Sequence, residues 1–252
     1  MTQNCQNGGE MDMKRWSCAC VAGFAGKLCQ RLIYDCSEGF WLNYPTGVYD
    51  IQPLLATSPF SVMCKMWYGG RTHILMRKKP YLLFNRTWDE YRNGFGNLSE
   101  DHWLGLEQIY LLTNSFSDVT LKVQIKKHSL HSFQQFYYNF RVSDEASLYC
   151  LNFSFSTPNS DKQKVLGDSL KPGLGAPFST FDRDNDGDVT VNCAERHQSG
   201  WWFPSPCNET KANPLGRLEQ ENSVWSGKAE NAFWWDDLRD MAPYTIELWL
   251  VR

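Results

Sequence analysis

The stretch that decides the fold runs from Asp182 to Asn208 and reads DRDNDGDVTVNCAERHQSGWWFPSPCN. Its first half places an aspartate at every second position: Asp182, Asp184, Asp186 and Asp188. Carboxylates spaced so closely repel one another unless a hard cation or basic side chains neutralise them. Its second half joins two cysteines through a Trp-Trp pair, which indicates a disulfide-closed aromatic loop. We therefore expect a cation site with a ligand-binding loop beside it.

The aspartate spacing at first suggests an EF-hand loop. Such a loop needs a bidentate glutamate at its twelfth position. The twelfth residue counted from Asp182 is Cys193, and no good helical pattern flanks the loop. The EF-hand interpretation therefore fails, and two others stay open: a different hard-cation loop or a solvated acidic turn.

Charge and composition exclude several classes of function. The formal net charge is −3, and no run of Lys and Arg is longer than residues 77–79. This argues against nucleic acid or an anionic membrane surface as the main partner. The apolar runs fall short of the roughly 18 residues of a membrane span. The five histidines show no metal spacing and no Gly-x-Ser-x-Gly motif occurs, so we do not expect an enzyme.

The cysteine count indicates an oxidising compartment. Nine cysteines in 252 residues, together with Asn-x-Ser/Thr sequons, favour a secreted glycoprotein. The candidate glycosylation sites are Asn85, Asn97, Asn152 and Asn208. The first ten residues are polar, so we expect no signal peptide there. For a secreted protein this favours a fragment or a chain with an upstream part.

Residues 5–29 form a cysteine-rich unit that is too short to bury a useful core without cross-links. The unit resembles the C-terminal part of an EGF-like module. The matching residues are Cys5-Gln6-Asn7-Gly8-Gly9, Cys18-Ala19-Cys20, Gly23-Phe24-Ala25-Gly26 and Cys29. Two family cysteines that pair with each other are both absent. The resemblance implies bridges Cys5–Cys18 and Cys20–Cys29, each worth about 2–3 kcal/mol, and a spacer role for residues 1–31.

A brief linker over residues 30–35 leads to the main domain, in which strands and helices alternate as in an α+β fold. Thr87 and Glu90 form a capping box, and Gly94 ends the short helix that they begin. Residues 119–127 alternate apolar and polar side chains, which predicts a half-buried strand. The further elements expected are strands over 47–53, 60–67, 133–142, 148–155 and 244–251, a helix over 103–113 and a loop over 157–177.

Residues 36–252 resemble a fibrinogen-related domain, shared by the fibrinogen C-terminal globule, ficolins, tachylectins, angiopoietins and tenascins. The matching runs are Gly47–Pro53, Phe84–Trp88, Glu90-Tyr91, Gly94–Leu98, Trp103–Gly105, Phe178–Asp186, Cys193–Glu195, Gly200–Trp202 and Cys207. The resemblance implies mixed or antiparallel sheets with short helices, and bridges Cys36–Cys64 and Cys193–Cys207. Cys150 is left over. It is either a buried apolar filler or an intermolecular link, and its apolar strand pattern favours burial.

The resemblance also implies a calcium site in the acidic loop. The family's site takes two alternate aspartate side chains and nearby backbone carbonyls. By motif, these fall on the side chains of Asp184 and Asp186 and on carbonyls near Asp188 and Thr190. Extracellular calcium modules bind at roughly 0.1–1 mM. At about millimolar calcium the ion would add only about 0.4–1.4 kcal/mol of stability, so it would order the loop rather than hold up the fold.

A ligand pocket is implied beside this loop, around a cis peptide bond before the second cysteine, here Pro206–Cys207. By position the pocket residues are Arg196, His197, Pro206, Cys207, Asn208 and Glu230. Lectin members grip an acetyl group there. This sequence differs, because Asn208 stands where they commonly have histidine. The acidic Glu230 would equally suit an amine.

Two functions follow from the resemblance. The first is a secreted, calcium-assisted, lectin-like recognition protein that binds acetylated glycans or microbial surface groups. The alternative is an angiopoietin- or tenascin-like extracellular ligand that binds a receptor or matrix protein. Single sites of this kind bind weakly, so useful recognition needs several copies, such as a homo-oligomer.

Overall fold

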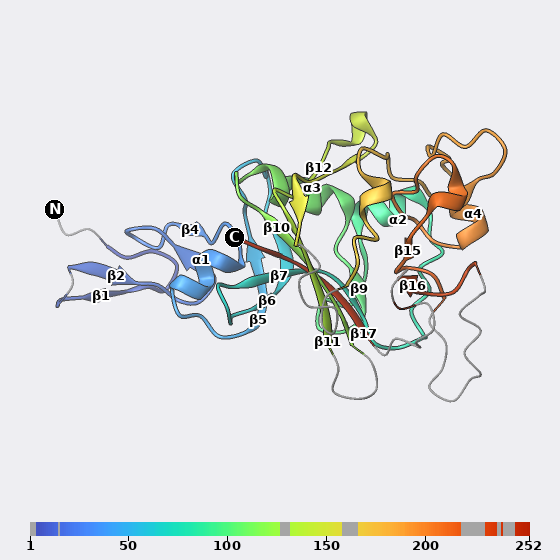
Figure 1. The fold of residues 1–252 in the computed structure, drawn as a ribbon. Coiled ribbons are helices and arrows are strands. Elements are labelled where there is room, and N and C mark those ends of the chain that lie inside the picture. Colours follow the sequence, from blue (N-terminus) through green and yellow to red (C-terminus); the bar gives the residue numbers. More distant parts are fainter. Residues whose placement is uncertain are drawn as a thin grey trace. The chain divides into compact units, whose positions relative to one another are not determined.

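The fold is taken from a computed structural model, which describes residues 4–14, 16–126, 132–157, 166–217, 230–235, 238 and 245–252. The chain divides into two compact units (Figure 1). The first comprises Met1–His73 with Val251–Arg252, and the second comprises Ile74–Leu250. Strand β7 (Arg71–Arg77) runs from the first unit into the second.

The first unit contains two small hairpins, one short helix and an antiparallel sheet. Its elements are β1 (Glu10–Asp12), β2 (Ser17–Ala19), β3 (Phe24–Ala25), β4 (Arg31–Leu32), α1 (Cys36–Trp41), β5 (Gly47–Ile51) and β6 (Phe60–Lys65). The hairpins are β1–β2 and β3–β4, and β6 pairs with β5 and with the start of β7. Disulfides join Cys5 to Cys18, Cys20 to Cys29 and Cys36 to Cys64, the same pairs that the two resemblances imply.

Residues 30–35 are hydrogen-bonded to the segment before them, at Gly23, and to the segment after them, at Gln52. The Ile33 N–H donates to the Gly23 carbonyl at 3.0 Å, and the Ile33 carbonyl accepts from the Gln52 N–H at 3.0 Å. The Ile33 side chain is fully buried. This short connecting segment is therefore folded, because its backbone groups are hydrogen-bonded within the protein rather than left to water.

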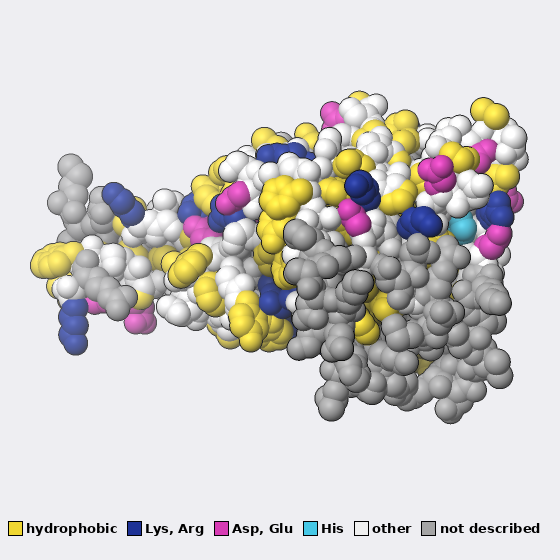
Figure 2. Space-filling model, in the orientation of Figure 1, with side chains coloured by type: hydrophobic (Ala, Val, Ile, Leu, Met, Phe, Trp, Pro, Cys, Tyr) yellow, Lys and Arg dark blue, Asp and Glu magenta, His cyan; other side chains and the backbone are white. Residues whose placement is uncertain are grey.

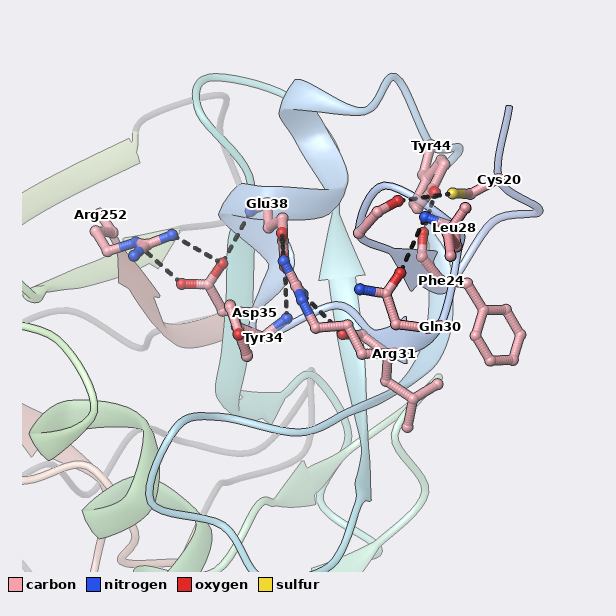
Figure 3. Close-up of polar contacts among 12 residues, drawn as sticks. Cys20, Phe24, Leu28, Gln30, Arg31, Tyr34, Asp35, Glu38, Tyr44 and Arg252 are labelled. Carbon is pink, nitrogen blue, oxygen red and sulfur yellow. Dashed lines mark hydrogen bonds and ion pairs between the residues drawn. The ribbon is translucent and has the colours of Figure 1, made fainter. Parts of the chain in front are cut away.

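Two ion pairs brace the same region (Figure 3). The Arg31 guanidinium donates to both oxygens of Glu38, at 2.9 and 2.7 Å, and the Tyr34 N–H donates to Glu38 at 2.8 Å. Asp35 caps α1 by accepting from the Glu38 N–H at 2.9 Å, and it pairs with Arg252 at 3.1 Å. Burial pushes the pKa of Glu38 upward, but the bonds from Arg31 and Tyr34 outweigh it and lower that pKa.

We expect Glu38→Gln to lower the free energy of unfolding at pH 7 by about 1 kcal/mol, because part of the pair is screened by solvent. A depressed folded-state pKa stabilises the protein above the unfolded-state pKa, which is about 4.3. The difference between variant and wild type should therefore shrink as the pH falls below about 4. Urea unfolding at pH 7 and pH 3 measures it. An equal difference at both values would contradict the role of the charge.

The second unit holds a larger sheet and most of the helices. Its elements are α2 (Trp88–Asn93), β8 (Phe95–Gly96), β9 (His102–Trp103), α3 (Leu106–Asn114), β10 (Thr120–Lys126), β11 (Ser132–Tyr138), β12 (Arg141–Val142), η1 (Glu145–Ser147), β13 (Leu151–Asn152), β14 (Phe155–Ser156), η2 (Lys171–Gly173), α4 (Cys193–His197), η3 (Cys207–Glu209), β15 (Ala212–Asn213), β16 (Trp234–Trp235) and β17 (Thr245–Val251). The sheet order is β14-β11-β10-β17-β7, and β9 pairs with both β7 and β8. The fold is α+β, as the sequence predicts.

The helix predicted from the capping box is confirmed as α2. The Thr87 side chain accepts from the Glu90 N–H, and the Glu90 carboxylate accepts from the Thr87 N–H. The second predicted helix begins later than expected, at Leu106. Trp103 lies in β9 instead, and Gly105 turns the chain with a φ of 114°. Because helical φ is negative, no helix continues through that residue.

The long strands are interrupted where the backbone turns left-handed. Asn139 has a φ of 53° and separates β11 from β12 within residues 133–142. Residues 148–155 begin with Leu148 and Tyr149, also at positive φ, so only β13 and part of β14 are extended there. The predicted strand 119–127 forms β10, but both of its faces are buried rather than one. Lys127, Tyr244 and residues 158–165 of the predicted loop lie outside the described residues.

An aromatic cluster forms the core beneath the site. Phe178 lies 5.1 Å from Tyr91 and 5.1 Å from Trp202, and Trp103 lies 5.7 Å from Tyr91, measured between ring centroids. Gly200 packs directly on this cluster, because a Cβ there would lie 2.6 Å from the Tyr91 ring. The residues on either side of the acidic loop are therefore anchored in the core. None of the described helices is long and apolar enough to cross a membrane.

Candidate functional site

The acidic loop is tied at its first end to helix α2. The Asp182 carboxylate accepts from the Trp88 N–H at 3.0 Å, at the start of that helix. The Arg183 guanidinium lies 4.1 Å from the centre of the Trp88 ring, and its Nη1 lies 3.7 Å from Glu145. The Trp88 indole N–H also donates to Glu145 at 2.9 Å. Asp182 and Arg183 thus fix where the loop leaves the core.

Two further aspartates fold the loop by accepting from its own backbone. Asp186 is buried and accepts from the N–H groups of Asp188 at 2.9 Å and Cys193 at 2.8 Å. Asp188 accepts from the Thr190 hydroxyl at 2.7 Å and from the Cys207 N–H at 3.0 Å. These bonds, the Thr190 hydroxyl first, lower the pKa of Asp188 to about 2. Asp188 therefore links the acidic loop to the cysteine loop while ionised.

The aspartate pair Asp184 and Asp186 fits a hard cation. The Asp184 carboxylate accepts from the Asp186 N–H at 3.4 Å, so the two residues lie together. Burial raises the pKa of Asp186, and the charge of Asp184 raises it further. A cation between them would relieve this repulsion. Among the described residues no three acidic, histidine or cysteine side chains gather in a metal-binding cluster. Carbonyl oxygens would therefore have to supply the remaining ligands.

The cysteine loop is closed by the disulfide between Cys193 and Cys207, and helix α4 forms its first five residues. The cis peptide bond of this loop is Ser205–Pro206. The expected cis bond at Pro206–Cys207 is therefore wrong by one position. The amide before a proline has a much smaller preference for trans than other peptide bonds, so the cis form is more readily adopted there. The Ser205 hydroxyl donates to the Gly187 carbonyl at 3.1 Å, a second link to the acidic loop.

The expected pocket residues Arg196, His197 and Glu230 come together. The Arg196 Nε donates to Glu230 at 2.5 Å, and a second guanidinium nitrogen binds the other carboxylate oxygen. His197 is buried between Phe203, which it stacks on at 5.2 Å, and Trp234 at 6.1 Å. Its Nδ1 lies 2.8 Å from the Glu230 carbonyl oxygen, and its Nε2 lies 3.8 Å from the Cys207 sulfur. Figure 2 shows charged side chains of both signs gathered over α4.

Asn213 is a site residue that the sequence alone did not indicate. It is fully buried, and its amide donates to the carbonyls of His197, Glu230 and Ala232 at 3.1–3.3 Å. Its side-chain oxygen accepts from the Ser199 hydroxyl at 2.7 Å. One side chain thus joins α4 to the β15–β16 hairpin. An asparagine followed by a proline is the only signal that the sequence carries for it.

Of the other expected pocket residues, Cys207 is buried, whereas Pro206 and Asn208 lie at the surface. Asn208 is exposed at the start of η3, and Pro206 is exposed just before it. All four candidate glycosylation asparagines are exposed. Cys150 forms no disulfide and is partly exposed, with its sulfur 3.0 Å from the Ser147 carbonyl oxygen. The expectation that Cys150 is buried is therefore wrong, because the chain turns at Leu148 and Tyr149 before the strand begins.

Comparison with known proteins defines the family. Residues 32–242 match the C-terminal globular domain of fibrinogen beta and gamma chains. The human fibrinogen-like protein 1 is 34% identical over 82% of this chain and 67% of its own length. Mouse angiopoietin-4 is 36% identical over 72% of this chain and 35% of its own. This chain belongs to the fibrinogen C-terminal domain family.

Solved structures share the same fold. The fibrinogen-like globe domain of human ANGPTL2 has a TM-score of 0.77 at 27% identity and covers 86% of this chain and 98% of that one. Lamprey fibrin D-dimer, solved with the peptide ligand Gly-His-Arg-Pro-amide, has a TM-score of 0.71 at 26% identity. It covers 86% of this chain and 72% of that one.

Proposed function

We propose that this chain is a secreted, non-enzymatic ligand that binds an extracellular protein. The single observation that supports the proposal is the sequence similarity of this chain, over most of its length, to fibrinogen-like protein 1 and angiopoietin-4. Four disulfides suit an oxidising extracellular compartment. The peptide bound to lamprey fibrin supports a protein or peptide as the kind of partner.

The surface that we assign to this partner consists of Arg196, Glu230 and the exposed loop residues Ser205, Pro206 and Asn208. The geometry there favours a protein over an acetylated sugar. Arg196 and Glu230 neutralise each other, and His197 is enclosed by two aromatic rings. These side chains therefore leave few free donors for the carbonyl of an acetyl group, which a small-ligand pocket would need. The sequence similarity to fibrinogen-like protein 1 and the geometry of Arg196, His197 and Glu230 both favour a protein ligand, so we rank the lectin-like function second.

In the same proposal, residues 1–31 are an EGF-like spacer and residues 36–252 are the binding domain. The bridges Cys5–Cys18 and Cys20–Cys29 support the EGF-like assignment. The folded segment after them, with Ile33 buried, would hold such a spacer against the start of the next domain rather than on a loose tether.

Calcium is part of the proposal, held by Asp184 and Asp186 with carbonyls near Asp188 and Thr190. The ion would order the acidic loop and thereby the cysteine loop that Asp188 joins to it. We expect Asp184→Ala to weaken calcium binding while the fold survives, because the Asp184 carboxylate accepts from the Asp186 N–H at a long 3.4 Å. Titration calorimetry with calcium measures this. Unchanged affinity would remove Asp184 from the site.

The class of partner is tested with two probes in parallel. The immobilised chain is exposed to a panel of purified receptor and matrix-protein ectodomains, and the soluble chain is passed over N-acetylated sugar resin, each with calcium and with chelator. We expect saturable binding to an ectodomain and no retention on the resin. Retention that acetate displaces, without ectodomain binding, would overturn the proposal in favour of a lectin.

A further inference from the structure

The turn between β6 and β7 carries two exposed aromatic side chains that do not contribute to the buried core. Trp67 is 45% exposed and Tyr68 is 82% exposed. Both belong to the first unit, whereas α4 belongs to the second. We call this turn, residues 65–71, the aromatic tip.

The backbone of the aromatic tip has positive φ at three successive residues, which is unfavourable for Tyr68. Tyr68, Gly69 and Gly70 have φ angles of 49°, 90° and 80°. Glycine adopts such angles freely, whereas a bulky residue such as tyrosine rarely does. Strained positions of this kind cluster at functional sites. Tyr68 gains no burial in return, so its conformation is not explained by packing within this chain.

The base of the aromatic tip is rigid. A Cβ on Gly70 would lie 2.2 Å from the Cys36 carbonyl oxygen, so the turn is pressed against the start of α1. The disulfide between Cys36 and Cys64 fixes the same place. Lys65 and Arg71 lie opposite each other in the backbone pairing of β6 with β7. The Met66 N–H donates to the Thr46 hydroxyl at 3.0 Å. A rigid, exposed aromatic pair loses little conformational entropy on binding.

The aromatic tip also carries two basic side chains, Lys65 and Arg71. The Lys65 ammonium lies 5.5 Å from the centre of the Trp67 ring, and the Arg71 guanidinium lies 5.1 Å from the centre of the Tyr68 ring. Residues 60–73 contain no aspartate or glutamate. Tryptophan, tyrosine and arginine are the residues enriched at the energetic centres of protein interfaces. Two cations are too few to hold a polyanion by charge alone, since that attraction grows with the number of neutralised charges.

We propose that the aromatic tip is a second docking surface, which inserts Trp67 and Tyr68 into an apolar socket rimmed by carboxylates on a protein partner. Lys65 and Arg71 face the acidic rim, so the partner is recognised by shape and by charge complementarity. This surface goes beyond the proposed function, because it does not involve α4, the acidic loop or calcium.

A phage-displayed library of random peptides tests the proposal, using the full chain as bait. We expect the enriched peptides to combine apolar residues with aspartate or glutamate. The variant Trp67→Ser/Tyr68→Asn should bind the enriched pool at least about tenfold more weakly. Asparagine suits the left-handed angle of Tyr68, so this variant should unfold at the same urea concentration as wild type or higher. Tyr81→Ser, which removes an aromatic ring that is 80% exposed elsewhere, is the matched control and should bind normally.

A charge variant and two further probes complete the test. Lys65→Glu should weaken binding of the pool and reduce its dependence on salt. Equal binding of wild type and Trp67→Ser/Tyr68→Asn, or an enriched pool without carboxylates, would overturn the proposal. So would binding to heparin or to phosphatidylserine vesicles that depends on Trp67 and Tyr68 when no peptide is enriched.

Discussion

Replacing Trp202 with alanine is expected to lower the free energy of unfolding by about 3–5 kcal/mol, the usual range for truncating a buried tryptophan. Its ring is 2% exposed and packs on Phe178, Trp103 and Trp201, with centroids 5.1, 6.5 and 5.0 Å away. The substitution would leave a cavity lined by rings that cannot collapse onto it. It would also leave the Tyr149 carbonyl without the indole N–H that donates to it at 2.7 Å.

Urea unfolding of Trp202→Ala measures this loss. Trp41→Ala is the matched control, because the Trp41 side chain is 75% exposed and its removal should change stability by no more than about 0.5 kcal/mol. Similar midpoints for the two variants would show that Trp202 does not hold the core together. Trp202 lies within the cysteine loop, so the same variant should also lose partner binding.

Arg77→Leu is expected to lower the free energy of unfolding by about 2–5 kcal/mol, because Arg77 is a buried cation that donates hydrogen bonds to backbone carbonyls. Its guanidinium donates to the carbonyls of Pro214 and Gly216 at 3.0 and 2.6 Å and lies 4.3 Å from the centre of the Phe84 ring. Burial lowers the pKa of Arg77 to about 10, so it stays charged at neutral pH. Leucine would leave both carbonyls buried without this donor.

Arg77 also acts on the candidate site, through the segment that follows Asn213. Loosening Pro214 and Gly216 should disturb the Asn213 bonds to α4. Arg86→Leu is the control, since Arg86 forms a partly exposed pair with Glu90 that should contribute no more than about 1 kcal/mol. Equal urea midpoints for the two leucine variants would contradict the account of Arg77.

Much of the fold follows from local patterns in the sequence. The capping box of Thr87 and Glu90 defines α2 because both of its hydrogen bonds form within one turn. The alternation after Val119 predicts β10, but not the burial of Lys122 and Gln124, which depends on packing far along the chain. The sequence pattern misplaces the start of α3, because Trp103 suits a helix pattern, whereas its pairing with Leu75 is set by a distant strand.

The candidate site is less predictable from sequence, because its contacts join distant segments. The aspartate spacing indicates a cation loop. It does not indicate that Asp188 accepts from the Cys207 N–H, nineteen residues away, or that Asp182 accepts from the Trp88 N–H at the start of α2. The pair of Arg196 and Glu230 spans thirty-four residues. Each of these contacts depends on how the loops return to the core.

The measurement that tests the central claim most directly is the affinity of Arg196→Ala/Glu230→Ala for the ectodomain panel, by surface plasmon resonance. The two side chains are 40% and 53% exposed, so removing both should leave the fold intact and bury no unpaired charge. Lys79→Ala/Glu100→Ala removes a comparable exposed pair and is the control. The account predicts that the wild type and the control bind one ectodomain of the panel with equal affinity. Arg196→Ala/Glu230→Ala should bind the same ectodomain at least about tenfold more weakly. Equal binding by all three proteins, or no binding to any ectodomain, would contradict it.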